Sequence, residues 1–553
     1  MEHLVFTLVT FVLFTALVGI ISGKIVKNSD DQKTAKGYFL AGNGLGGFFI
    51  AGSMLLTNLS AENLVGLSGQ SYAANMSGMA WEATAVIATI IMAFVFLPMY
   101  LRKGYTTLPE FMEERYGVGV RRMVSILFLI GYLVIGIPVC LYAGAIAFEQ
   151  IFDFATVFGI SEGMALTILI VLVGIIGALY AVLGGMRAVA VSDTINGILL
   201  VLGSVLVVVF GFIAVGKLSG GGFIVGVKDV ITYEPAKLNA IGGKNDPVPF
   251  ACIFTGMLLA NLFYWGTNQV LIQRALGAEN LKEGQKGVLL SGFLKMMVPL
   301  LLVIPGVIAA RLVPGLTSKD FAYPSLVARS LPWPVVGLFC AALFGSIIST
   351  YTVKLAKKIG WGFAAFAIIF TPFLDVLSTG LYDFGRSFTG FYNIPIITMV
   401  LVGMFSKKGS KLGAICATIF HIAFYACYKF IFPHIDTPFT NAVSGINYMY
   451  IYAISFVIML VIIFVCSKIA PNTKVFDKSA SRNDGYDMTA WKHKNAFAIW
   501  LVSFLVYEYF IFSPAGIATE NKNVVRIAIV TAIFVIETIV LIVKEMNKRK
   551  KTA

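Results

Sequence analysis

Long apolar runs alternate with short polar connections along the chain. A helix needs about 20 mostly apolar residues to cross a bilayer, and about fifteen segments satisfy this requirement. They are residues 3–26, 45–71, 76–101, 121–152, 161–184, 188–216, 248–275, 285–312, 332–353, 359–378, 387–406, 411–432, 445–468, 493–513 and 523–545. The pattern therefore predicts an all-α polytopic membrane protein with about fifteen transmembrane helices.

The second and seventh segments carry polar residues where lipid would surround an ordinary span. Glu62 and Asn63 lie in the stretch TNLSAENLVGLSG (57–69), and Asn261 lies in the seventh segment. Helix packing by small and polar residues explains the glycines and serines of the first stretch but explains Glu62 with Asn63 poorly. A break in a helix frees backbone groups that lipid cannot satisfy, so a broken helix must line a cavity. We therefore expect two broken helices.

The two interrupted segments lie five helices apart, and each opens a block of five. Transporters built from inverted repeats bind substrate and ions at such broken helices near the membrane midplane. The sequence predicts a first repeat at 45–216 and a second at 248–406, joined by an extracellular loop at 217–247. Extra helices are expected at 1–44 and 407–553.

Two ionisable residues, Glu82 and Lys295, lie inside the second helix of each predicted repeat. A charge at membrane depth usually faces a water-filled cavity or a partner. Both residues are therefore candidate hydrogen-bonding groups for a polyhydroxylated ligand. The alternative is a structural ion pair between them. Glu508 and Glu537 also lie in spans, outside both repeats, and no role is predicted for them.

The composition supports a membrane protein and gives its orientation. Only 13% of residues are charged and 58% are hydrophobic, whereas soluble domains average about 25% charged. Lys and Arg concentrate in alternate short loops, which the positive-inside rule assigns to the cytoplasm. The net charge of +14 therefore indicates orientation and not nucleic-acid binding. We expect a multi-pass protein of the cell inner (plasma) membrane, with the N-terminus outside and the C-terminus cytoplasmic.

Enzyme chemistry is not indicated. The sequence shows no nucleophile–base pair, phosphate-binding loop or metal-binding cluster, and the six cysteines lie singly in apolar runs, where ordinary helix packing explains them. The segment LPEFMEERYG (108–117) has one polar and one apolar face. We expect it to lie at the inner membrane surface without crossing.

Several motifs resemble the solute:sodium symporter family, specifically the bacterial sodium/sugar cotransporters related to the animal sodium/glucose cotransporters. They are KGYFLAG (36–42), NLSAENLVGLSGQSY, TLPEFMEERYG, YAVLGGMRAVAVSDTINGILLVLG, LANLFYWGTNQVLIQRAL and GQKGVLLSGFLKMMVP. The similarity covers nearly the whole chain. It implies a five-plus-five inverted-repeat core of the LeuT type. It also implies symport by alternating access, in which sodium drives uptake of a glucose- or galactose-like sugar.

The resemblance also implies the binding residues. For the substrate they are Ser60, Glu62, Asn63, Glu82, Asn261, Tyr264, Lys295 and Arg386, of which Tyr264 matches an aromatic lid on the inner side of the sugar. For sodium they are the carbonyls of Leu56, Leu59 and Ser346 and the hydroxyls of Ser349 and Thr350, with Asp193 on the exit route. An all-oxygen shell suits a hard cation.

The chain departs from the family pattern at three places. Ala85 stands where a sugar-binding serine is expected, and Arg386 stands where a glutamine is expected. The polar turn and cytoplasmic connection that should follow Thr350 are missing near residues 350–358. We therefore expect weakened or lost sodium coupling. Alternatives are symport of another small polar solute, such as an acid held by Lys295 and Arg386, or a gated channel or sensor.

Overall fold

The computed structural model describes residues 2–27, 44–353, 360–372, 380–406, 409–472 and 485–552, apart from some side chains within helices, chiefly those of 179–194 and 348–353. Within these ranges the chain is helical, and its β-pairing is a single isolated bridge between Leu45 and Ala278. The predicted all-α class is confirmed.

The first half of the chain contains twelve labelled α-helices in the described ranges. They are α1 (Glu2–Lys27), α3 (Gly47–Asn58), α4 (Ala61–Ala73), α5 (Ala80–Ala83), α6 (Ala85–Ile91), α7 (Leu97–Lys103), α8 (Leu108–Tyr116), α9 (Val118–Gly131), α10 (Ile137–Phe152), α11 (Phe154–Phe158), α12 (Glu162–Leu218) and α13 (Phe223–Tyr233). Short π-helical segments at Met92–Phe96 and Tyr132–Gly136 join α6 to α7 and α9 to α10.

The second half continues in the same way. Its α-helices are α14 (Gly256–Thr267), α15 (Gln269–Leu276), α16 (Leu281–Leu302), α17 (Ile304–Leu312), α18 (Ala322–Ser330), α19 (Trp333–Val353), α20 (Gly360–Phe370), α21 (Leu381–Phe405), α22 (Lys411–Ala426), α23 (Pro438–Ser444), α24 (Tyr448–Ile469), α25 (Lys494–Ile511) and α26 (Val524–Thr552). A short 3₁₀ turn, η8 (Lys319–Phe321), precedes α18.

In the described part of the chain, nine helical segments are long and apolar enough to cross a membrane. The bent pair α3 and α4 makes a further candidate, and shorter apolar stretches lie in α1, α12 and α19. This establishes a multi-pass membrane protein, while the number of about fifteen spans stays a prediction. α8 has nine residues, too few to cross a bilayer.

Both predicted interruptions are present. α3 ends at Asn58, Leu59 and Ser60 adopt extended backbone, and α4 begins at Ala61, with a bend of 66° between the two helices. α14 and α15 are likewise separated by one extended residue, Asn268, whose side chain caps α15 through the Val270 amide. The symmetry that would relate the two repeats stays a prediction.

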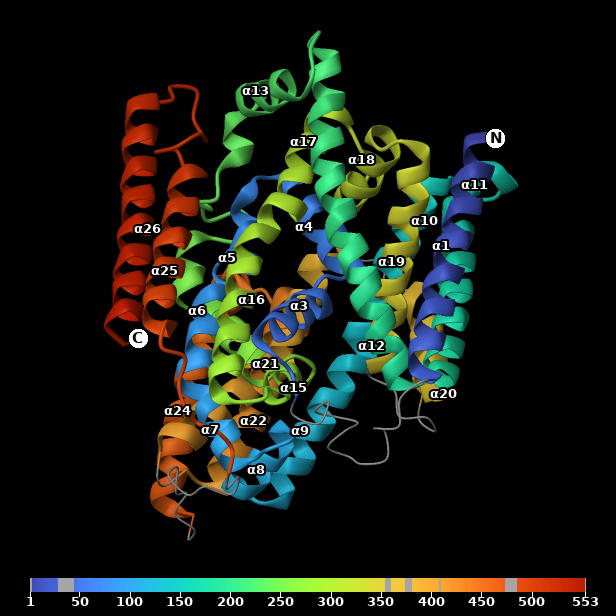
Figure 1. Cartoon of the computed structure of the whole chain (residues 1–553). Helices are drawn as coiled ribbons and strands as arrows, with labels where there is room; N and C mark the ends of the chain where they lie inside the picture. Colours follow the sequence, from blue (N-terminus) through green and yellow to red (C-terminus); the bar gives the residue numbers. More distant parts are fainter. Residues whose placement is uncertain are drawn as a thin grey trace.

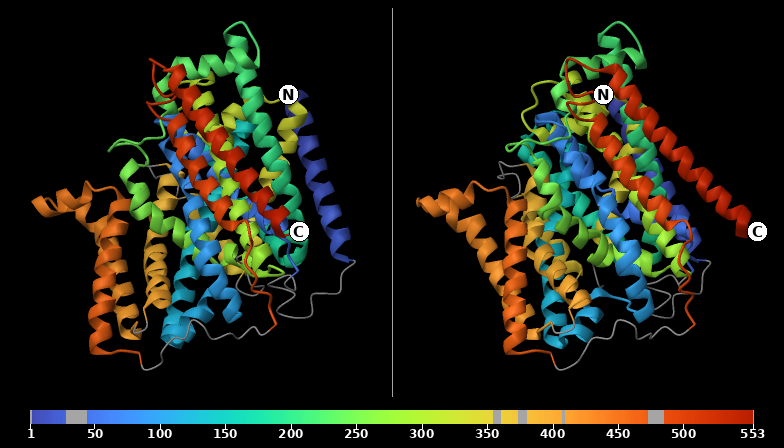
Figure 2. Two further views of the ribbon diagram at one scale, coloured as in Figure 1. Left: turned by 60° about the vertical axis from the view of Figure 1, so that its left-hand side comes forward. Right: turned by 90° about the vertical axis from the view of Figure 1, so that its left-hand side faces the viewer.

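The helices form one bundle with distinct ends (Figure 1). α13 lies at one end and α8 at the other, and α1 lies at the opposite side from α25 and α26. The turned views show α26 packed outermost against α25 (Figure 2). A buried histidine, His421 of α22, joins its helix to α24 through Ser455 Oγ at 2.6 Å and to α21 through the Gly390 carbonyl at 2.9 Å.

Glu537 has a partner at the interface of α25 and α26. Its Oε1 accepts a hydrogen bond of 2.7 Å from Ser503 Oγ. Trp500 Nε1 donates to Thr538 Oγ1 at 3.0 Å one turn away. Polar groups in lipid need such internal partners. Glu537 therefore joins the two last helices, an arrangement that the sequence alone did not suggest.

One predicted boundary is wrong. The segment expected to begin at residue 387 begins at Leu381, after Gly380 with a left-handed φ of 84°. Hydropathy underestimates the length of this helix, because the polar residues of its first turns have hydrogen-bonding partners inside the protein. The predicted loop at 217–247 contains helix α13. Gly226 of α13 lies so close to the Phe212 carbonyl of α12 that a Cβ there would be 1.8 Å from the oxygen.

Candidate functional site

Two adjoining cavities lie where the broken helices meet. The first cavity is lined by Asn58, Trp81, Glu82, Ala260, Asn261, Tyr264, Trp265, Lys295, Tyr382, Arg386, Thr389 and Asn393. The second cavity shares six of these residues and extends past Thr57, Ser60, Glu62, Tyr132, Cys140, Asn268 and Tyr392. Tyr264, three residues before the end of α14, is one of the six residues that line both cavities.

A buried ion pair forms one wall of the first cavity. Lys295 Nζ of α16 contacts the carboxylate of Glu82 on α5, and the two side chains are 2% and 3% exposed. Burying a charge is costly unless it is paired and hydrogen-bonded. The ammonium group also donates to Asn58 Oδ1 and lies 5.9 Å from the centre of the Trp265 ring. The structural ion pair and the cavity-lining position are therefore both present.

Asn58 connects this wall to the break in α3 and α4. Its Nδ2 donates to the Tyr264 hydroxyl at 2.7 Å, and its Oδ1 accepts from Lys295. Its backbone carbonyl accepts a 2.6 Å hydrogen bond from Asn63 Nδ2. Asn63 thus satisfies a carbonyl at the end of α3, where the helix no longer supplies a partner.

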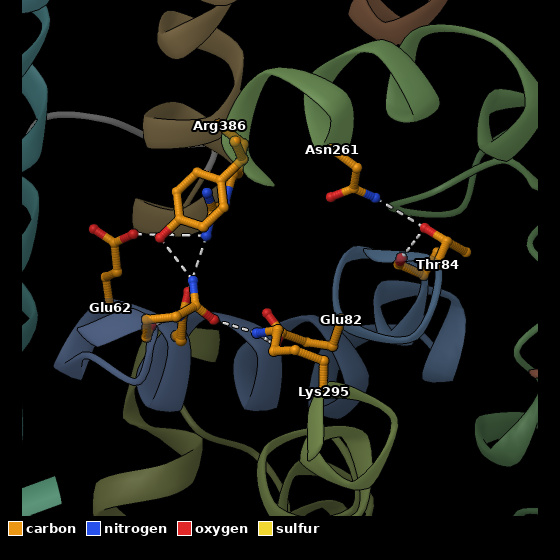
Figure 3. A network of polar contacts seen from close by, with 10 residues as sticks. Glu62, Glu82, Thr84, Asn261, Lys295 and Arg386 are labelled. Carbon is orange, nitrogen blue, oxygen red and sulfur yellow. Dashed lines mark hydrogen bonds and ion pairs between the residues drawn. The ribbon is translucent and has the colours of Figure 1, made fainter. Parts of the chain in front are cut away.

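Arg386 forms the opposite wall. Its Nη2 donates to Asn63 Oδ1 at 2.9 Å and lies 3.6 Å from Glu62 Oε1. Its guanidinium carbon lies 4.7 Å and 5.4 Å from the ring centres of Tyr382 and Trp81, respectively. Such contacts fix a guanidinium plane. Figure 3 shows the Glu62–Arg386 pair at one side of the site and the Glu82–Lys295 pair at another.

Thr84 is a residue of this site that the sequence analysis missed. Asn261 Nδ2 donates to Thr84 Oγ1 at 3.0 Å, and the threonine hydroxyl donates to the Ala80 carbonyl at 2.6 Å (Figure 3). Thr84 occupies the residue between α5 and α6, next to Ala85. Thr84 directly precedes Ala85, the position where the family pattern has a sugar-binding serine. This neighbouring hydroxyl was the feature of the sequence that could have identified Thr84.

The predicted substrate residues come together, with one difference. Glu82, Asn261, Tyr264, Lys295 and Arg386 line the first cavity, and Ser60 and Glu62 line the second. Asn63, which is 1% exposed, lies behind this lining and supports Arg386 and the helix break. Asn58, Thr84, Trp81, Trp265 and Tyr382 join the site without having been predicted.

The predicted sodium residues are only partly described. Leu56 and Leu59 flank the end of α3, and Ser346 lies on α19. Adjacent residues of α12 bring these helices together: Gly197 packs against Leu56, and Asn196 packs against Gly345. The side chains of Ser349, Thr350 and Asp193 lie outside the described residues, as does the motif at 36–42.

A second polar cluster joins α4, α21 and the η8 turn. Asp383 of α21 accepts hydrogen bonds from Gln70 Nε2 of α4 at 2.6 Å and from Lys319 Nζ at 2.7 Å. Asp320 accepts from the Leu381 amide at 3.0 Å. Desolvation by burial raises the pKa of Asp320. The loop at η8 is thereby tied to both α4 and α21.

Known proteins with similar sequences indicate the family of this chain. An Escherichia coli protein described as an uncharacterized symporter, YidK, is 38% identical over 532 residues, which cover 91% of this chain and 90% of that protein. A sodium/glucose cotransporter of Vibrio parahaemolyticus is 29% identical over 477 residues, covering 76% of this chain and 85% of the relative.

One solved structure agrees with this fold. A Na⁺-coupled sialic acid symporter in a substrate-bound outward-open state has a TM-score of 0.67 and 18% identity to this chain, and the match covers 85% of this chain and 99% of that one. Residues 38–358 match the profile of the sodium:solute symporter family. Because this match spans more than half of the chain, the protein belongs to the sodium:solute symporter family.

Proposed function

We propose that the protein carries a sugar or polyol into the cell by alternating access, driven by sodium. The observation that supports this proposal is the first cavity at the two helix breaks. Its wall combines a buried ion pair, the amides of Asn58 and Asn261 and the rings of Trp81 and Trp265. Sugar hydroxyls need polar partners, and the apolar face of a sugar ring needs an aromatic surface. Family members are transporters, not enzymes.

Three relatives bear on the class of solute. The Vibrio relative is described as a sodium/glucose cotransporter, and relatives from mouse and human are described as sodium/myo-inositol cotransporters. A sugar and a cyclic polyol share a ring of hydroxyl groups. We infer the same chemistry for this chain from the cavity wall, in which Glu82 and Lys295 supply the charged partners.

Sodium is proposed to bind at the other face of the same break. The carbonyls of Leu56 and Leu59, the carbonyl of Ser346 and the hydroxyls of Ser349 and Thr350 would supply oxygen ligands, which suit a hard cation. Support comes from the packing of α12 against both α3 and α19 near Leu56 and Gly345. Asp193 would lie on the exit route.

The orientation proposed from the loop charges places α13 outside and α8 inside. α13 and α8 lie at opposite ends of the bundle, and α26 runs from the end with α13 toward the end with α8 (Figure 1). This arrangement suits an N-terminus outside and a C-terminus in the cytoplasm. The repeat boundaries at 45–216 and 248–406 are retained as part of the same proposal.

The strength of coupling is expected to depend on the segment after α19. The match to the family profile ends at residue 358. The alignment with the Escherichia coli symporter is 532 residues long but takes in 91% of this 553-residue chain, so this chain has gaps relative to that protein. A shortened connection near 350–358 would leave the predicted sodium ligands Ser349 and Thr350 with less helix to support them. We therefore expect weaker sodium coupling than in relatives with the full segment.

Uptake by the full chain in proteoliposomes tests these proposals. Labelled sugar should accumulate inside when sodium is high outside, and a potassium gradient of the same size should drive less accumulation. Equal accumulation in both gradients would contradict sodium coupling. Rapid flux that only equilibrates the sugar, in either salt, would favour the alternative of a gated channel. Sodium-driven uptake as fast and as tight as in the Vibrio relative would contradict the expected weakening.

A further inference from the structure

The charges that line the first cavity do not balance. Its lining includes two cationic side chains, Lys295 and Arg386, and one carboxylate, Glu82. Lys295 and Glu82 are paired with each other. Arg386 is therefore the excess positive charge of this wall, and its side chain is 17% exposed. A cation enclosed with its solute is stabilised by a negative partner, because burial weakens solvation.

Glu62 compensates Arg386 only in part. The carboxylate is 3.6 Å from Nη2, which is longer than a direct hydrogen bond of about 2.7–3.2 Å. Glu62 lines the second cavity and is not part of the lining of the first. A carboxylate placed inside the first cavity could approach the guanidinium more closely than Glu62 does.

The guanidinium group is held in a defined plane. The Tyr382 and Trp81 rings lie near it, and Asn63 accepts one of its hydrogen bonds. A guanidinium group has five N–H donors; Asn63 accepts from one of them, and Tyr382 is a second hydrogen-bonding partner. A fixed, planar fork of donors matches a carboxylate better than it matches a hydroxyl group. Preorganisation of this kind lowers the cost of binding.

We propose that the transported solute is an acidic sugar, such as a uronic acid, and that Arg386 binds its carboxylate. The hydroxyl groups then contact the opposite wall, formed by Glu82, Lys295 and Asn261. Arg386 is the specificity-determining residue, because it selects acidic over neutral sugars. This inference rests on the proposed function and narrows its substrate class.

Matched pairs of ligands test the proposal. Galacturonate and galactose, and glucuronate and glucose, differ in the carboxylate and little else. Binding to the purified full chain can be followed by the fluorescence of Trp81 and Trp265, and uptake by competition in proteoliposomes. We expect each uronate to bind at least about tenfold more tightly than its neutral partner, in line with a charge-assisted hydrogen bond. Equal affinities would overturn the proposal.

Three variants identify the residue responsible. Arg386→Gln should reduce the preference for the uronate to within about twofold while retaining binding of the neutral sugar, because glutamine offers an amide without charge. Arg386→Lys should keep a preference for the acid. Arg329→Gln, at an exposed position on α18, should behave as wild type. A preference that survives in Arg386→Gln would overturn the role of Arg386.

The outcomes separate the two proposals. Binding of neutral sugars as tightly as uronates would leave sugar transport standing and refute the acidic substrate. Failure of all four ligands to bind wild-type protein would refute both. Folding of each variant is checked by its elution as a single species in detergent, so that a lost signal reports binding and not aggregation.

Discussion

Lys319 Nζ lies 2.7 Å from Asp383 Oδ2, and this ion pair joins the η8 turn to the first turn of α21. Gln70 of α4 bonds the other oxygen of the same carboxylate. Asp383 and Arg386 lie three residues apart on α21, so one turn of helix carries both the ion pair with Lys319 and a wall of the first cavity.

Removing this ion pair should loosen the attachment of the η8 turn to α21 without unfolding the protein. In Asp383→Asn the amide oxygen can still accept from Gln70, but Lys319 loses its charged partner. Both side chains of the pair are 25% exposed, so we expect at most about 1 kcal/mol of lost stability. Hydrogen exchange followed by mass spectrometry should show faster exchange in residues 314–321. Asp436→Asn, in another loop, is the control, and unchanged exchange in Asp383→Asn would contradict the assigned role.

The Glu82–Lys295 pair offers a test that separates stability from binding. Lys295→Met leaves Glu82 buried without its partner, and such losses cost about 3–5 kcal/mol. The double variant Glu82→Gln/Lys295→Met removes both charges and should regain most of the thermal stability. Neither protein should bind the sugar, which the fluorescence assay measures. A double variant that folds and binds with wild-type affinity would mean that the pair is structural only.

Thr84 should act through Asn261. Thr84→Val keeps the shape of the side chain but removes the hydroxyl that accepts from Asn261 Nδ2. We expect KM for uptake to rise about five- to tenfold, the equivalent of about 1 kcal/mol, with little change in the maximal rate. Thr84→Ser retains the hydroxyl and should restore a KM close to that of wild type. A KM in Thr84→Val equal to that of Thr84→Ser would rule out this positioning role.

The Asp229–Arg311 contact predicts that the stability of the folded protein depends on pH. Arg311 donates to Asp229 at 2.8 Å and 3.3 Å, and these hydrogen bonds lower the pKa of Asp229 on α13 below its usual 3.8. A carboxylate with a lowered pKa stabilises the folded state above its unfolded pKa, and this contribution is lost as pH falls through the folded value. The difference in melting temperature between wild type and Asp229→Asn should therefore be constant from about pH 7 to 5 and shrink below about pH 4. A difference that persists at pH 3 would contradict this.

The local pattern of the sequence was sufficient to predict the two helix breaks. Polar residues at membrane depth, such as Glu62 and Asn261, indicated cavities because lipid offers them no partner. The pairing of Glu82 with Lys295 was foreseen as one of two readings, and the structure shows the pair within a cavity wall.

Other parts of the site depend on contacts between distant segments. The bond between Thr84 and Asn261 joins residues 177 positions apart, and no local pattern indicates it. The start of α21 was misplaced for the same reason: Asp383 and Arg386 look like loop residues until Lys319 and Glu62 are brought against them. A hydropathy profile describes the polarity of each segment, but it does not show which distant residues will become the hydrogen-bonding partners of its polar side chains.

The last residue of α3, Asn58, makes three hydrogen bonds to other parts of the site. Asn58 is tied at once to Tyr264, to Lys295 and, through its carbonyl, to Asn63. A rotation of this one helical turn displaces all three partners together, along with the neighbouring carbonyls of Leu56 and Leu59. The bonds of Asn58 to Tyr264, Lys295 and Asn63 would therefore change together in such a rotation, rather than one after another.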